Sequence, residues 1–331
     1  MFSVPAVAED TVFVGSCAGI FYAFNKATGA VRWSYDIGKD GKQKSFHGNP
    51  LITDDLILIG TDHNCVPDGI GHLYAFERST GKVRWKYQTT SVPTDILRVG
   101  QSVYFGSFQD NWYALNLRDG SLLWKFSTGA ANESCDMIKA PVADDRHLYV
   151  AGLDGIVYSL EAQSGRVVWK RKLPAVPSTG LALKDKMLFV GAGNNRIYRL
   201  NAETGTTVAE LPIEAVPFGR ITLTADALLL FLDNRSERSG YVVTIDPDLK
   251  KIRWRQSSAN WRSERPHAWG QLVVAGNCRG EVAAFRASDG APQWQLNLKG
   301  CISSIGSSEQ RMFVGVQEGT LYAYELLSPK R

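Results

Sequence analysis

The sequence has little of what marks a nucleic-acid-binding, membrane-spanning or exported chain. Lys and Arg exceed Asp and Glu by only 37 − 33 = 4, and no basic tract is present. The longest apolar run, Ala227 to Leu232, is far shorter than the roughly 20 residues of a membrane helix. Residues 1–5 lack the basic and apolar segments of a secretion signal. We therefore expect a soluble chain with no transmembrane segment and no nucleic-acid partner.

Cysteine is also scarce, and its spacing excludes several kinds of site. No two cysteines are adjacent and none has the CxxC spacing, which argues against a zinc knuckle, a redox pair or haem attachment. We expect the five to be unpaired small hydrophobes in a reducing compartment, which favours the cytoplasm. They are Cys17, Cys65, Cys135, Cys278 and Cys301.

The five histidines contain no HxxxH pair, and no helix is predicted to carry one. Asp62, His63 and Asp68 lie in one predicted loop and have side chains that bind metals. A solvated loop is the better explanation of these residues, so we expect no metal site.

A repeat runs through the chain. Each copy has Thr, Ser or Asp followed by Gly, with Trp four residues after the Gly, and short β-branched and aromatic strands precede it. The Gly allows the positive φ of a tight turn, and the Trp is large enough to fill the wedge between neighbouring units. Two copies depart from the pattern: Ala209 replaces Trp, and Lys250 stands where Gly is expected before Trp254. The repeat tryptophans are Trp33, Trp85, Trp124, Trp169, Trp254 and Trp294.

Four short strands in every 40 or so residues predict an all-β, eight-bladed β-propeller of four-stranded antiparallel blades. The last unit ends without a Trp strand, so the eighth blade is expected to be incomplete. We expect one domain over residues 1–331, with blades at about 2–37, 45–89, 91–128, 134–173, 175–213, 215–257, 262–298 and 300–327.

The motif A-x-[ND]-x-x-[TS]-G-x-x-x-W resembles the tryptophan-docking repeat of the pyrroloquinoline-quinone (PQQ)-type propellers, and the resemblance covers essentially the whole chain. That family includes quinoprotein dehydrogenases, an outer-membrane assembly lipoprotein and sensor domains of kinases. The resemblance implies a periplasmic or extracytoplasmic location, against the cytoplasmic indication of the cysteines. It also implies PQQ with calcium as a cofactor. The family's quinoproteins hold PQQ between a tryptophan and a disulfide of adjacent cysteines, which is missing here, so we expect no cofactor.

The inner strands of a propeller line a central funnel, and alignment of the units places many polar residues there. Thr94, Thr179 and Ser303 are among them. The second and sixth units have long insertions between strands two and three, with 76 − 60 = 16 and 245 − 231 = 14 positions against 9 in most units. Ligand-binding candidates in the funnel and insertions are His47, His63, Asp95, Lys139, Phe218, Arg220, Arg235, Trp261 and Arg265.

Two function hypotheses follow. The first is a monomeric, non-catalytic scaffold that presents its loop face or funnel to a protein or to a small polar or anionic ligand. The second is an enzyme that uses the funnel for acid–base or oxidative chemistry on a small molecule, because crowded ionisable groups shift one another's pKa. Its catalytic candidates are His47, Asp95, Lys139 and Glu264. Trp261 and Trp269 lie outside the repeat position and are interpreted as aromatic walls of the funnel.

Overall fold

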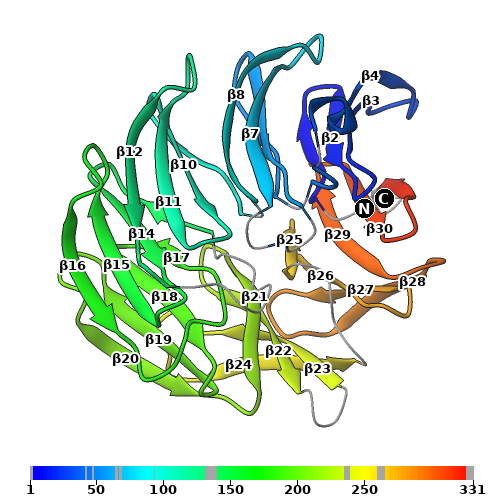
Figure 1. Cartoon of the computed structure of the whole chain (residues 1–331). Helices are drawn as coiled ribbons and strands as arrows, with labels where there is room; N and C mark the ends of the chain where they lie inside the picture. Colours follow the sequence, from blue (N-terminus) through cyan, green and yellow to red (C-terminus); the bar gives the residue numbers. More distant parts are fainter. Residues whose placement is uncertain are drawn as a thin grey trace.

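The computed structural model describes residues 3–41, 43–46, 48–63, 66, 69–92, 94–130, 140–234, 239–258 and 265–325. These residues form eight antiparallel sheets around a ring, seven with four strands and the last with three (Figure 1). The two chain ends lie side by side, where the first and eighth sheets meet (Figure 1). The all-β, eight-bladed propeller with a shorter last blade is therefore confirmed. No helix in the described ranges is long and apolar enough to span a membrane.

Each sheet runs outward from the centre in chain order. The strands of the first four sheets are β1 (Ala6–Ala8), β2 (Thr11–Gly15), β3 (Ile20–Asn25), β4 (Val31–Asp36); β5 (Leu51–Ile52), β6 (Leu56–Gly60), β7 (Ile70–Glu77), β8 (Val83–Thr90); β9 (Leu97–Val99), β10 (Ser102–Ser107), β11 (Asn111–Asn116), β12 (Leu122–Ser127); β13 (Val142–Ala143), β14 (His147–Ala151), β15 (Ile156–Glu161) and β16 (Val167–Lys172). Those of the last four are β17 (Ala182–Lys184), β18 (Met187–Ala192), β19 (Arg196–Asn201), β20 (Thr207–Pro212); β21 (Val216–Leu223), β22 (Leu228–Asn234), β23 (Ser239–Ile245), β24 (Ile252–Ser258); β25 (His267–Trp269), β26 (Leu272–Gly276), β27 (Glu281–Arg286), β28 (Pro292–Asn297); β29 (Ile302–Ser307), β30 (Arg311–Val316) and β31 (Leu321–Glu325).

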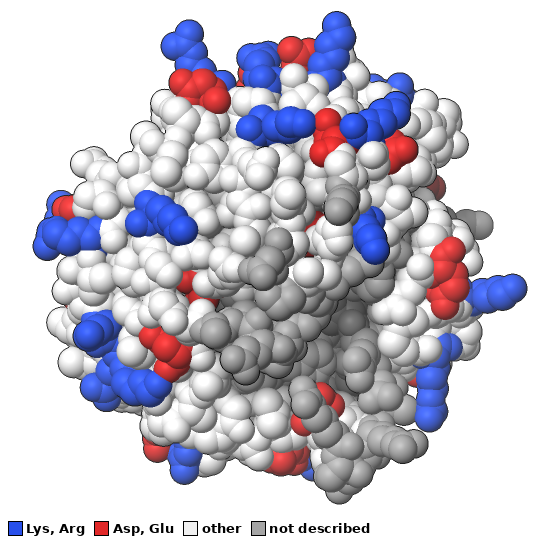
Figure 2. All heavy atoms as spheres, viewed as in Figure 1, with Lys and Arg blue, Asp and Glu red and all other residues white. Residues whose placement is uncertain are grey.

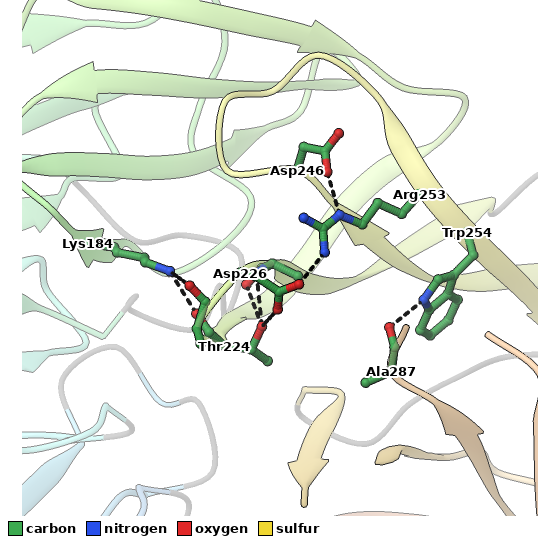
Figure 3. A network of polar contacts seen from close by, with 9 residues as sticks. Lys184, Thr224, Asp226, Asp246, Arg253, Trp254 and Ala287 are labelled. Carbon is green, nitrogen blue, oxygen red and sulfur yellow. Dashed lines mark hydrogen bonds and ion pairs between the residues drawn. The ribbon is translucent and has the colours of Figure 1, made fainter. Parts of the chain in front are cut away.

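Five of the repeat tryptophans each join a sheet to the next one. Trp33 donates its indole N–H to the Arg78 carbonyl of the second sheet at 3.0 Å. Its ring lies against Gly81, where an added Cβ would be 2.5 Å from the indole. Four further junctions repeat this arrangement, with N–H to O distances of 2.8–2.9 Å; Figure 3 shows one of them. They pair Trp85 with Leu117, Trp124 with Ala162, Trp169 with Ala202 and Trp254 with Ala287. The structural interpretation of these five tryptophans is therefore correct.

The junction between the fifth and sixth sheets is built differently. Ala209 occupies the Trp position, and the following turn places Leu249, rather than a Gly, at positive φ. Polar contacts join the sheets instead. Lys184 of β17 donates to the Thr224 carbonyl at 3.0 Å. Within the sixth sheet, Arg253 pairs with Asp226 at 2.7 Å and with Asp246 (Figure 3).

The long connection into the second sheet is packed into the protein. It begins with a 3₁₀ helix, Ile37–Asp40, whose Ile37 is fully buried. Asp40 accepts hydrogen bonds from Tyr74 at 2.9 Å and Lys86 at 3.0 Å, and from Tyr35. This stretch therefore anchors the first sheet to the second.

The insertion of the sixth unit starts as strand rather than loop. Asp233 pairs with Gly240 and Asn234 with Ser239, so that β22 and β23 are each seven residues long. Residues 235–238, with Arg235, lie outside the described residues.

Candidate functional site

The inner strands of the third to seventh sheets enclose a cavity of about 630 Å³ near the centre of the ring. Its lining combines apolar strand residues with a few ionisable side chains from distant parts of the chain. The ionisable members are Asp95, Arg220, Arg265 and His267. Three of these four are sequence candidates, and the tertiary structure brings them together.

Arg220 reaches across the cavity because β21 is irregular. Its pairing with β22 shifts between Phe218 and Thr222, and Gly219 in the bulge has a φ of 72°. A bond from the Gly180 N–H to the Gly219 carbonyl, at 2.9 Å, ties the bulge to the fifth sheet. Arg220 then forms an ion pair with Asp95 of the third sheet, with 15% and 24% of the two side chains exposed. This pair connects opposite sides of the ring.

His267, the first residue of β25, also faces this cavity, and its Nε2 lies 2.7 Å from the Ser307 hydroxyl. Burial, and then the positive charge of Arg265, lowers the pKa of His267 to about 4. The imidazole is therefore neutral at physiological pH. Sequence reasoning missed it as a site residue, because a lone histidine in a short strand carries no motif.

Hydroxyl side chains expected to line the funnel bond instead to their own sheets. The Gly106 N–H donates to the Thr94 hydroxyl at 3.1 Å, and the hydroxyl donates to the Gly106 carbonyl at 3.2 Å. The same twelve-residue spacing joins Ser3 to Gly15, Thr179 to Gly191 and Ser303 to Gly315. Thr94, Thr179 and Ser303 each hold the second strand of their own blade through these bonds.

Two further candidates lie away from the cavity lining. Phe218 stacks on Phe231 with ring centroids 5.6 Å apart, as part of the core between the sixth and seventh sheets. His63 lies in the loop after β6, and its backbone N–H donates to the Ser91 hydroxyl at 3.0 Å. His47, Lys139, Arg235, Trp261 and Glu264 lie outside the described residues.

Trp269 is not an aromatic wall of the funnel. It is 6% exposed, and its indole N–H donates to the Ser308 carbonyl at 2.9 Å. It joins the seventh sheet to the eighth, which is a structural role.

The described residues do not fit the PQQ site that the fold family implies. That site needs a disulfide of adjacent cysteines, whereas the structure joins Cys278, in the turn after β26, to Cys301, just before β29. The cavity is instead crossed by the Arg220–Asp95 ion pair. Asp62, from the loop for which no metal site is expected, accepts a 2.6 Å bond from the Ser45 hydroxyl. No cluster of three or more metal-binding side chains occurs in the part of the chain that the structure describes.

Comparison with known proteins decides the family. Residues 2–208 and 238–328 match the sequence profile described as outer membrane protein assembly factor BamB. The chain belongs to this family. BamB of Yersinia pestis is 22% identical over 95% of this chain and 68% of that protein. BamB of Shewanella oneidensis is 24% identical over 53% of this chain and 45% of that protein.

Structural comparison agrees with the BamB fold. The crystal structure of BamB from Moraxella catarrhalis has a TM-score of 0.81 at 20% identity, covering 97% of this chain and 96% of that one. A quinoprotein ethanol dehydrogenase of Pseudomonas aeruginosa is also similar, at 25% identity over 42% of this chain and 25% of that protein. The resemblance to PQQ-type propellers is therefore confirmed, with BamB as the matching family.

The expectation of a cytoplasmic protein with unpaired cysteines is wrong. The relatives are outer membrane protein assembly factors by name, and Cys278 and Cys301 form a disulfide, a bond that persists in oxidising compartments. The spacing of the cysteines did not predict this disulfide, because Cys278 and Cys301 are 23 residues apart and meet only when the seventh and eighth sheets pack together. Cys65 and Cys135 lie outside the described residues.

Proposed function

We propose that this chain is a non-catalytic scaffold that works outside the cytoplasm and binds other proteins during the assembly of outer membrane proteins. The observation that supports the proposal is the match to the BamB family over residues 2–208 and 238–328. This match extends from the first blade to the eighth. The Cys278–Cys301 disulfide supports the compartment. The ion pair that crosses the funnel supports binding at an outer surface.

We further propose that the partner contacts the loop face at the second blade. Val66, in the loop between β6 and β7, is 44% exposed, and Ile70, the first residue of β7, is 46% exposed. Apolar side chains exposed on a loop of a rigid scaffold are favourable contacts for a protein partner. The described Lys and Arg side chains on the face seen in Figure 2 are interspersed with Asp and Glu. An apolar contact therefore explains partner binding better than a field of one sign.

The test is cross-linking in the cell envelope of a Gram-negative host. A tagged, exported form of the full chain is treated with a cross-linker, purified and analysed by mass spectrometry. A designed eight-bladed propeller with the same fold serves as the control, such as the one with a TM-score of 0.80 at 14% identity. We expect outer-membrane assembly proteins to be enriched with this chain only. Equal enrichment with the designed propeller would refute the scaffold function.

The loop-face proposal has its own control. Val66→Asp and Ile70→Asp should each lower the yield of cross-linked partner at least several-fold. Val168→Asp, on β16, changes a side chain that is similarly exposed, at 43%, and should leave the yield unchanged. Equal yields from all three variants would move the binding surface elsewhere without affecting the assembly function.

A small polar or anionic ligand in the cavity is a second candidate, favoured by the two arginines in its lining. A thermal-shift screen of small carboxylates, with PQQ and calcium included, tests it together with the enzyme alternative. The scaffold proposal expects no shift at saturating ligand, and a shift lost in Arg220→Ala would favour the second candidate.

A further inference from the structure

The junction between the fifth and sixth sheets contains a cavity of about 450 Å³ where other junctions hold a tryptophan. Pairing across the first sheet aligns a Phe, an Ala and the docking Trp, namely Phe13, Ala23 and Trp33. The same register in the fifth sheet aligns Phe189, Arg199 and Ala209. The central strand thus carries the large residue, Arg199, and the outer strand carries the small one, Ala209, which is the reverse of the first sheet. The large residue is also a cation. We call this cavity, lined by Met187, Phe189, Arg199 and Pro247 among others, the fifth–sixth slot.

Two polar groups of the slot have no partner within the described residues. The Nε of Arg199 is buried and finds no acceptor there. The Pro247 carbonyl stands three residues before Lys250, as the acceptor carbonyls of the other junctions stand three residues before their Gly. No described donor reaches it. The slot therefore offers one donor and one acceptor beside an apolar wall.

The neighbouring cations Lys184, Arg253 and Lys250 are already paired, so they do not compete for the Pro247 carbonyl. Lys184 bonds to the Thr224 carbonyl, and Arg253 pairs with Asp226 and Asp246 (Figure 3). Lys250, in the Gly position, pairs with Asp248 at 2.8 Å.

The residues that line the slot lie within the family match, and Ala209 lies just outside it. The family match ends at residue 208 and resumes at 238, so the unmatched segment begins at Ala209. The exchange of residues is therefore a departure from the repeat that the other sheets of this chain share.

We infer that the fifth–sixth slot binds a tryptophan side chain presented by a partner polypeptide, with an acidic residue next to that tryptophan. The indole of the partner's tryptophan fills the space that is empty because residue 209 is Ala and not Trp. It stacks on the planar guanidinium of Arg199 and donates its N–H to the Pro247 carbonyl. The adjacent carboxylate accepts from Arg199. This inference rests on the proposed protein-binding function and names one partner chemistry for it.

The probe is a blocked tripeptide, Asp-(5-fluoro-Trp)-Asp, observed by ¹⁹F NMR so that the chain's own tryptophans are silent. The full chain at about 0.5 mM would bind about a third of a dilute probe if Kd were 1 mM. We expect the probe signal to shift and broaden, and an unlabelled Asp-Trp-Asp peptide, but not Asp-Ala-Asp, to reverse the change. No shift, or equal competition by both peptides, would overturn the inference.

Variants locate the site. R199A/A209W restores the family pattern and fills the slot with the chain's own indole, so the probe should bind at least tenfold more weakly. Val208→Trp adds an indole on the neighbouring, 50% exposed position of β20 and should bind like the unchanged chain. Equal binding of the probe by R199A/A209W and by the unchanged chain would refute the inference that the probe binds in the slot. A dimer seen by sedimentation, and abolished only in R199A/A209W, would also refute the inference, because a second copy of the chain would then occupy the slot. Either result leaves the envelope cross-linking test of the scaffold function unaffected.

Discussion

Replacing Gly120 by Ala tests whether the docking glycines are required by the indole or only by their turn. Gly120 has a φ of 71°, and an added Cβ would lie 2.6 Å from Trp85. Gly29 is the matched control. Its φ is 72°, but no atom of the described residues lies within 4 Å of the added Cβ. Both substitutions therefore share the backbone strain, and only one of them displaces a tryptophan.

The two costs separate by magnitude. An alanine at positive φ loses roughly 1–2 kcal/mol in either turn. At Gly120 the indole must also move, which weakens its 2.9 Å bond to the Leu117 carbonyl and disturbs a packed junction. A hydrogen bond contributes about 1 kcal/mol and overpacking costs about 1–3 kcal/mol. We expect Gly120→Ala to lower the free energy of unfolding by about 2–4 kcal/mol more than Gly29→Ala does.

Urea denaturation followed by far-ultraviolet circular dichroism gives the free energy of unfolding of both variants and of the unchanged chain. The slope of that free energy with urea concentration should be the same for all three, which shows that the same transition is being measured. Equal losses of stability in the two variants would refute the reasoning. The requirement for Gly would then come from the turn alone, and the indole contact would contribute nothing measurable.

Three further predictions concern ionisable and covalent groups. The pKa of His267 is lowered from 6.5 to about 4, so on acidification the unfolded chain binds a proton at this residue before the folded chain does. The free energy of unfolding should therefore fall by up to about 3 kcal/mol between pH 6.5 and pH 4. Urea midpoints of His267→Asn, measured over the same pH range, should lack this part of the loss. Asp95→Asn removes the carboxylate charge from the Arg220–Asp95 ion pair and should cost about 3 kcal/mol, whereas D95L/R220M should cost less; a similar cost for both would count against the pair. Reducing the Cys278–Cys301 disulfide, whose cysteines are 23 residues apart, should lower the free energy of unfolding by about 3 kcal/mol, and thermal melts with and without reductant measure it.

The sequence predicted the blades well because each carries its own local signals. The Gly before each Trp, the alternating strands and the turn residues act within a few residues, and they recur often enough for the count of eight to be reliable. The exceptions were visible too. Ala209 and Lys250 break the repeat, although the sequence did not indicate that Arg199 fills part of the space left by the missing indole.

The candidate site was predicted only in part. Asp95, Arg220 and Arg265 do meet at one cavity, but Phe218 packs in the core and Thr94 bonds to its own sheet. The side chain of a polar residue at the start of an inner strand can either face the funnel or form a hydrogen bond with the backbone of its own sheet. Position along the strand does not distinguish them, because the choice depends on which way the side chain turns.

The sequence by itself determined the class of fold, the number of blades and the five tryptophan-docked junctions, because those depend on short-range periodicity and turn chemistry. Only the tertiary structure decided which distant residues meet: Arg220 with Asp95 across the ring, and Cys278 with Cys301 between two sheets. It also decided that the fifth–sixth slot stays open, since that depends on how Arg199 and Pro247 face each other across a junction. Closure of the ring sets these contacts, and no single repeat contains that information.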